Sequence, residues 1–99
     1  MSDQIRVPLE VLRRATQVIL DQMEDSGVSE LTLDKDYFWS IPPDEAYDVY
    51  NEPSNLTVGQ LTECLDNLKV IVEDPSRSTS FALVWLGELM RAVGHGAVR

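Results

Sequence analysis

Three stretches of the sequence repeat apolar residues at every third or fourth position, and this periodicity limits the possible folds more than any other feature. Such spacing places the apolar side chains on one face of an α-helix. It predicts helices over about residues 8–25, 57–73 and 79–93. Pro8 suits the first turn of the first helix, and Gly27 stands where a helix commonly ends. We therefore expect a mainly α chain.

The second and third helices have their own boundary signals. Thr57 and Gln60 have the spacing of a capping box, which predicts that the second helix begins there. Gly94 and Gly96 are expected to end the third helix. The apolar stripe predicted for the second helix comprises Val58, Leu61, Leu65, Leu68 and Val72, and that of the third includes Phe81, Trp85 and Leu89.

Two glycines fall inside the predicted helices, where each costs about 1 kcal/mol relative to alanine. Gly59 and Gly87 are these residues. One interpretation is a close approach of another segment, with Gly59 near Trp39 or Trp85. The other is that a small residue is merely tolerated there.

The segment 28–55 loses the helical period and mixes acidic residues with aromatic ones. We expect a short strand or extended segment around 30–40, ended by Pro42 and Pro43, and one helical turn within 44–50. No two-residue hairpin signal is present. The extended segment is therefore either coil packed on helices or an edge strand that pairs across a dimer. The predicted architecture is a single three-helix domain with an irregular acidic insertion between the first two helices.

The charge of the chain is concentrated in one part of it. The net charge is −9 over 99 residues, which argues against binding to nucleic acid or to an anionic membrane surface. Residues 21–52 contain a single cation, Lys35, and ten acids: Asp21, Glu24, Asp25, Glu30, Asp34, Asp36, Asp44, Glu45, Asp48 and Glu52.

Residues suited to nucleophilic catalysis are scarce. Cys64 is the only cysteine and His95 the only histidine, so neither an internal disulfide nor a Ser-His-Asp arrangement with a well-held base is expected. We interpret Cys64 as a buried or half-buried structural thiol and His95 as a solvated residue of the tail. No signal peptide or membrane span is indicated, and a cytoplasmic protein without catalytic activity is the expectation.

Metal and cofactor motifs are also absent from the sequence. Asp34 and Asp36 begin like a calcium-binding loop, but Phe38 stands at the fifth position and Trp39 at the sixth, where glycine is required. We expect no metal ion and no cofactor. An enzyme that uses the carboxylates between Asp34 and Asp48 remains a third, weaker hypothesis.

Five of the seven aromatic residues lie in the acidic segment, and tyrosine and tryptophan are typical of protein interfaces. The alternative is that Phe38 and Trp39 close the core while the acids are only solvated. The predicted partner-binding residues are Asp34, Asp36, Tyr37, Asp44, Glu45, Tyr47, Asp48, Tyr50 and Glu52.

A block of this segment resembles one in small uncharacterised acidic bacterial proteins. It runs as YFWSIPPDE from Tyr37, YDVY from Tyr47 and LTVGQL from Leu56. No established activity comes with this resemblance. In size and charge the chain is also similar to bacterial immunity proteins, which neutralise basic toxins.

Two functions follow as hypotheses. The first is a small acidic protein-binding module, such as an immunity-type inhibitor, that docks residues 34–52 on a basic toxin or nuclease. The alternative is a homo-oligomer, in which the extended segment pairs with its copy or Phe81 and Trp85 are buried across a symmetric interface.

Overall fold

The computed structural model describes residues 4–98. Its internal contacts divide the chain into two compact units, Met1–Thr32 and Leu33–Arg99, which are described one at a time. The single domain expected from the chain length stays a prediction.

The first unit contains one helix, α1 (Leu9–Asp25), which confirms the helix predicted for residues 8–25. Pro8 directly precedes it with an extended backbone. At the other end Gly27 adopts a positive φ of 95°, which glycine reaches without steric cost. This turn lets the Gly27 N–H donate to the Glu24 carbonyl and the Val28 N–H to the Met23 carbonyl, so the last turn of the helix is closed.

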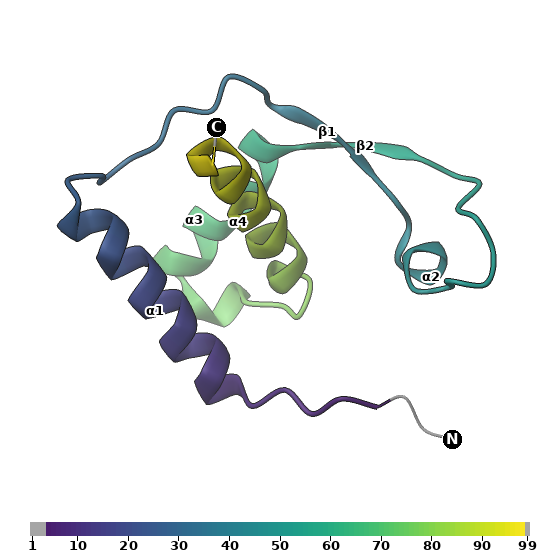
Figure 1. Cartoon of the computed structure of the whole chain (residues 1–99), viewed down its shortest axis with the longest axis horizontal. Helices are drawn as coiled ribbons and strands as arrows, with labels where there is room; N and C mark the ends of the chain where they lie inside the picture. Colours follow the sequence, from purple (N-terminus) through teal and green to yellow (C-terminus); the bar gives the residue numbers. More distant parts are fainter. Residues whose placement is uncertain (1–3, 99) are drawn as a thin grey trace. The chain divides into compact units, whose positions relative to one another are not determined.

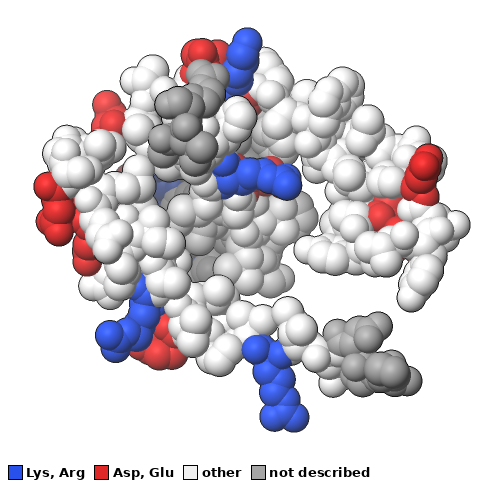
Figure 2. Space-filling model, in the orientation of Figure 1, with Lys and Arg blue, Asp and Glu red and all other residues white. Residues whose placement is uncertain are grey.

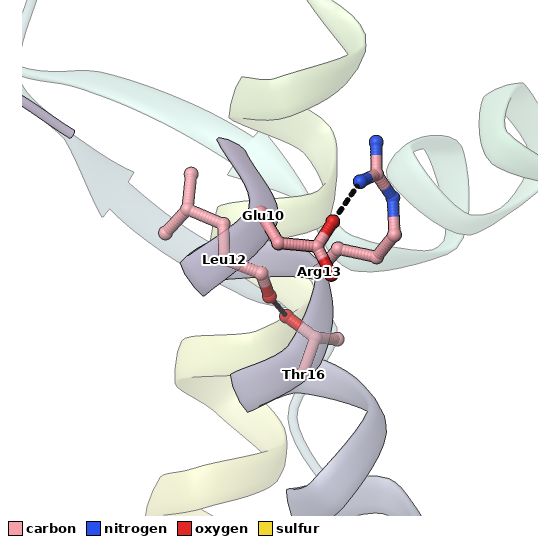
Figure 3. Close-up of polar contacts among 4 residues, drawn as sticks. All are labelled: Glu10, Leu12, Arg13 and Thr16. Atoms are coloured by element: carbon pink, nitrogen blue, oxygen red, sulfur yellow. Dashed lines mark hydrogen bonds and ion pairs between the residues drawn. The ribbon is translucent and has the colours of Figure 1, made fainter. Parts of the chain in front are cut away.

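Two side-chain contacts join residues within α1. Arg13 forms an ion pair with Glu10, 2.6 Å from nitrogen to oxygen, and the Thr16 hydroxyl donates to the Leu12 carbonyl over 2.7 Å (Figure 3). Side chains three residues apart are neighbours on a helix surface, and an ion pair at this spacing stabilises the helix by about 0.2–0.5 kcal/mol. A hydroxyl bonded to the carbonyl four residues earlier adds no such stabilisation. The ion pair supports the helix locally.

The second unit follows the order β1 (Tyr37–Ser40), α2 (Pro43–Ala46), β2 (Thr57–Gln60), α3 (Leu61–Glu73), a 3₁₀ turn η1 (Pro75–Arg77) and α4 (Ala82–Val98) (Figure 1). α3 packs against α4 and against η1. The chain is mainly α, as expected, with a small sheet.

That sheet is a two-stranded antiparallel hairpin. Tyr37 pairs with Gln60 and Ser40 with Thr57, and between them Phe38 faces Gly59 and Trp39 faces Val58. The strand expected around 30–40 is thus confirmed at 37–40. Its partner strand, β2, lies in the same chain. The sequence did not predict this pairing, because it contains no two-residue hairpin signal.

The helix predicted for 57–73 begins four residues later than expected, at Leu61, and the capping box at Thr57 does not form. Thr57 and Val58 are β-branched and favour the extended pairing with β1. The start of α3 is capped from another element, because Asp36 accepts from the Thr62 N–H over 2.7 Å. The contact from Asp36 replaces the capping box that the sequence predicted at Thr57.

The prediction for the third helix is wrong at both ends, since α4 runs from Ala82 to Val98. Gly94 and Gly96 lie within it, and His95 is an exposed residue of its last turns. A Cβ at position 96 would lie 3.3 Å from the Leu33 side chain, so glycine there permits Leu33 to approach the helix. A helix tolerates glycine at about 1 kcal/mol per residue.

The core of the second unit lies between α3 and α4. Cys64 is the buried side chain among the described residues, at 7% exposure, which confirms that this thiol is buried. The half-buried side of α3 comprises Leu61, Leu68 and Ile71. The predicted stripe was therefore displaced, because Leu65 and Val72 are exposed.

The aromatic residues of β1 divide between two faces of the hairpin. Phe38 is half-buried, and its ring lies over Gly59, where a Cβ would overlap it. Gly59 is therefore a strand residue in close contact with Phe38, whereas a helical position near Trp39 or Trp85 was expected. Trp39 is 71% exposed on the opposite face, so the expectation that it closes the core is wrong.

None of the helices in the described part of the chain is both long and apolar enough to span a membrane.

Candidate protein-interaction surface

The connection between β1 and β2 is organised by the carboxylate of Glu45. This side chain accepts hydrogen bonds from the Ser54 N–H and hydroxyl over 2.8 and 3.0 Å. It also accepts from the Asn55 N–H and side-chain amide, over 3.3 and 3.1 Å. These bonds favour the ionised form and lower the pKa of Glu45, with the Ser54 N–H as the largest cause. Glu45 thus connects α2 to Ser54 and Asn55, which precede β2.

A second carboxylate, that of Asp48, orders the chain between α2 and Ser54. Asp48 accepts from the Tyr50 N–H over 3.2 Å and from the Asn51 side-chain amide over 2.9 Å. This is the local pattern by which aspartate stabilises turns. Glu45 and Asp48, which were both predicted to bind a partner, therefore hold the loop on which other predicted partner-binding residues are exposed.

The displayed side chains are two tyrosines. Tyr47 is 88% exposed and Tyr50 is 91% exposed, and Val49 between them is exposed as well. Asp44 and Glu52 are exposed on the same connection and form no hydrogen bond or ion pair within the described residues. We call Asp44, Tyr47, Val49, Tyr50 and Glu52 the hairpin tip.

The charge of the tip has one sign. Residues 41–56 contain no lysine or arginine, and Figure 2 shows red and white atoms but no blue ones at the end of the hairpin that carries α2. An acidic surface with exposed aromatic side chains is complementary to a basic protein surface.

Asp36 belongs to the framework of the fold and lies outside the tip. Besides the Thr62 N–H, its carboxylate accepts from the Gln60 side chain over 2.9 Å and the Thr62 hydroxyl over 2.8 Å. These bonds lower the pKa of Asp36, and the bond from Gln60 contributes most. The carboxylate joins β1, the end of β2 and the first turn of α3.

The structure therefore separates the nine predicted partner-binding residues into three groups. Tyr47, Tyr50, Asp44 and Glu52 come together at the tip. Glu45, Asp48 and Asp36 hold the backbone. Asp34 lies before β1, and Tyr37 is exposed at its first position, away from the connection that forms the tip.

A second feature was missed by the sequence-based reasoning. A partly open hollow of about 250 Å³ lies between the inner face of the hairpin and the helices α3 and α4. Its walls include three aromatic rings and two carboxylates, together with the Cys64 thiol: Phe38, Phe81, Trp85, Glu63 and Glu88. Phe81 and Trp85 meet edge to face, with ring centroids 5.6 Å apart and planes at 71°. The helical spacing of Phe81, Trp85 and Glu88, of which Phe81 directly precedes α4, was the available signal.

The hollow has a negative electrostatic environment. The pKa of Cys64 is raised, first by removal of the thiol from water and then by the negative charges of Glu88 and Glu63. A raised pKa keeps the thiol protonated and therefore unreactive near neutral pH. Cys64 thus contributes to the wall of the hollow.

Within the described residues, no group of three or more histidine, cysteine, aspartate or glutamate side chains is arranged to hold a metal ion. Comparison with known proteins adds no relative: no family model, no curated protein and no solved structure matches this chain.

Proposed function

We propose that this chain is a small protein-binding module without catalytic activity of its own, which docks its hairpin tip on a basic surface of a partner protein. An immunity-type inhibitor of a basic toxin or nuclease would work in this way. The single cysteine suits a reducing compartment, so the cytoplasm is the location we propose.

The observation that supports this function most is the exposure of Tyr47 and Tyr50 on an ordered loop. A tyrosine side chain offers a large contact area and loses little conformational entropy when it is fixed. The hydrogen bonds of Glu45 and Asp48 hold the backbone in place before any partner arrives. Such preorganisation lowers the cost of binding.

The acids of the tip serve a different purpose from the tyrosines. Exposed charges act mainly on the rate of association and on the choice of partner, whereas aromatic side chains in the interface supply most of the affinity. Asp44 and Glu52 would therefore steer a basic partner toward Tyr47 and Tyr50. On a nuclease, such acids would occupy a surface suited to phosphate groups.

The test compares three double variants of the tagged protein in affinity capture from native lysate, eluted with rising salt. Tyr47→Ser/Tyr50→Ser should reduce the captured amount of a basic partner about tenfold or more, because interface tyrosines are frequent hot spots. Asp44→Asn/Glu52→Gln should slow association and weaken its salt dependence. The control Glu24→Gln/Glu73→Gln removes the same charge from exposed positions on α1 and α3.

Capture must depend on the tip for the proposal to stand. If the tyrosine variant retains the same basic protein as the control does, the tip is not the docking surface. The triple replacement of Asp44, Glu45 and Asp48 is a poor test, because two of these residues order the loop.

Self-association is the second candidate, and a feature of the hairpin favours it. In the described part of the chain the sheet has only two strands, so each strand has one unpaired edge. Beside these edges Trp39 and Val58 form an exposed apolar pair. Unpaired edges and apolar faces of this kind promote pairing with another chain.

Light scattering at micromolar concentration distinguishes the two candidates. Self-association predicts twice the monomer mass for the wild type and the monomer mass for Trp39→Ser/Val58→Ser. A monomeric wild type would eliminate this candidate and leave the docking proposal unaffected.

A further inference from the structure

The hollow between the hairpin and the two helices is lined by two kinds of side chain that suit an organic cation. Its walls include three aromatic rings, which favour contact with a planar or apolar group, and two carboxylates. The carboxylates of Glu63 and Glu88 form no hydrogen bond or ion pair within the described residues, although Glu88 is half-buried. A half-buried carboxylate has lost part of its hydration, and this loss costs free energy. A cation bound beside the carboxylate and the aromatic rings offsets that cost.

The size of the hollow limits what can enter it. Sites for drug-sized ligands occupy about 300–1,000 Å³, whereas this hollow measures about 250 Å³. It fits a single side chain better than a cofactor. A guanidinium or ammonium group attached to an apolar chain matches the lining on both counts, since aromatic faces attract cations and carboxylates accept their hydrogen bonds.

We propose that this hollow is a cation pocket, which receives an arginine or lysine side chain of the basic partner between Phe81, Trp85 and the carboxylates of Glu63 and Glu88. The inference rests on the proposed function and deepens it, because it identifies where a basic side chain of the partner would bind. The raised pKa of Cys64 supports the geometry, since it records the charges of both glutamates at the same wall. Arginine should bind better than lysine, because its planar group stacks on rings and contacts carboxylates through two bonds.

The direct test uses small probes in place of the partner. N-acetyl-arginine amide carries one positive charge, on the guanidinium, and N-acetyl-citrulline amide has nearly the same shape without that charge. N-acetyl-lysine amide compares the second basic side chain. Binding is followed by NMR through the indole N–H of Trp85, in a Trp39→Phe background that leaves one tryptophan signal; Trp39 is exposed and does not line the hollow.

The expected result is saturable movement of the Trp85 signal with arginine amide and weaker binding with lysine amide. Citrulline amide should leave the signal in place. Glu63→Gln/Glu88→Gln should weaken arginine binding at least about tenfold, because a charge-assisted contact is replaced by neutral ones. The Glu24→Gln/Glu73→Gln control should bind as the wild type does. Equal binding of citrulline amide, or unchanged binding by Glu63→Gln/Glu88→Gln, would overturn the pocket.

Failure of the pocket and failure of the proposed function give different results. If Tyr47→Ser/Tyr50→Ser abolishes capture of a basic partner while Glu63→Gln/Glu88→Gln leaves both capture and probe binding unchanged, the docking function stands and the pocket is wrong. If arginine amide binds with the charge dependence described while no basic partner is captured, the pocket stands and the docking function is wrong.

Discussion

At the scale of single residues, Asp36 connects three elements through one carboxylate. It accepts hydrogen bonds from Gln60 and Thr62, and the backbone carbonyl of the same residue accepts from the Leu61 N–H over 2.7 Å. A helix that begins without a capping side chain of its own leaves donors unpaired. Asp36 pairs one of these donors in α3, so its ionisation is coupled to folding.

We expect Asp36→Asn to destabilise the protein at neutral pH and to alter its response to acid. Hydrogen bonds lower the folded-state pKa of Asp36 below its ordinary value of 3.8. Its contribution is therefore complete above that value and is lost as the pH falls through the folded-state pKa. Urea unfolding at pH 7 and at a pH well below 3.8 should show the difference between variant and wild type shrinking in acid.

Asp66→Asn is the matched control for this measurement, because Asp66 is an exposed aspartate of α3 whose carboxylate forms no hydrogen bond within the described residues. A difference between wild type and Asp36→Asn that stays constant with pH would contradict the coupling. Glu45 also has a lowered pKa, so the double variant with Glu45→Gln should respond to acid least of all.

Gly59 is the second residue on which the hairpin depends. A Cβ at this position would overlap the ring of Phe38, which lies on its inner face. We expect Gly59→Ala to destabilise the protein by about 1–3 kcal/mol, the usual cost of forcing extra atoms into a packed contact. The cost should be smaller in a Phe38→Leu background, where the flat ring is absent. Thermal or urea unfolding of the four proteins in this cycle measures the coupling, and equal costs in both backgrounds would show that the ring is not responsible.

At the scale of elements, the connection between β1 and β2 is a loop closed by Glu45. Replacing this residue by glutamine removes the negative charge that strengthens the bonds from the Ser54 and Asn55 backbone amides, and the bond from the Asn55 side-chain amide is lost. We expect Glu45→Gln to raise hydrogen exchange at the Ser54 and Asn55 amides about tenfold while the melting temperature barely changes, because opening would be local. Exchange measured by NMR checks this, with Asp44→Asn as the control. Unchanged exchange would show that the loop is held by other contacts.

The elements also show where reasoning from sequence succeeds. α1 was predicted within one residue, because its apolar period, Pro8 and Gly27 all act locally. α3 was predicted four residues too long, since its true start depends on Asp36, which precedes it by 25 positions. α4 was cut short at Gly94 because a glycine signals the end of a helix only when the backbone leaves the helical conformation there, and this depends on its surroundings.

At the scale of the whole molecule, the candidate surface was predicted in composition but not in organisation. The acidic, aromatic segment contains the tip, as expected from sequence. Which carboxylates face solvent and which hold the loop could not be predicted, because Glu45 finds its partners nine and ten residues away. The hollow was missed since its lining comes from the hairpin and two helices, brought together only by folding.

Residues 57–60 have competing preferences for helix and for strand, and this competition also affects the unfolded chain. Thr57 and Gln60 retain the spacing of a capping box, and the residues that follow are helical in the native state. In the denatured ensemble, where β1 is not paired with these residues, the capping-box spacing favours a nascent helix that extends back to Thr57, against the β-branched side chains of Thr57 and Val58. We expect the pairing with β1 to unwind any helical turn formed at residues 57–60 during folding. Weakening the pairing with β1 would accordingly return these four residues to a competing helix, and the hairpin would lose its second strand to a different ordered state.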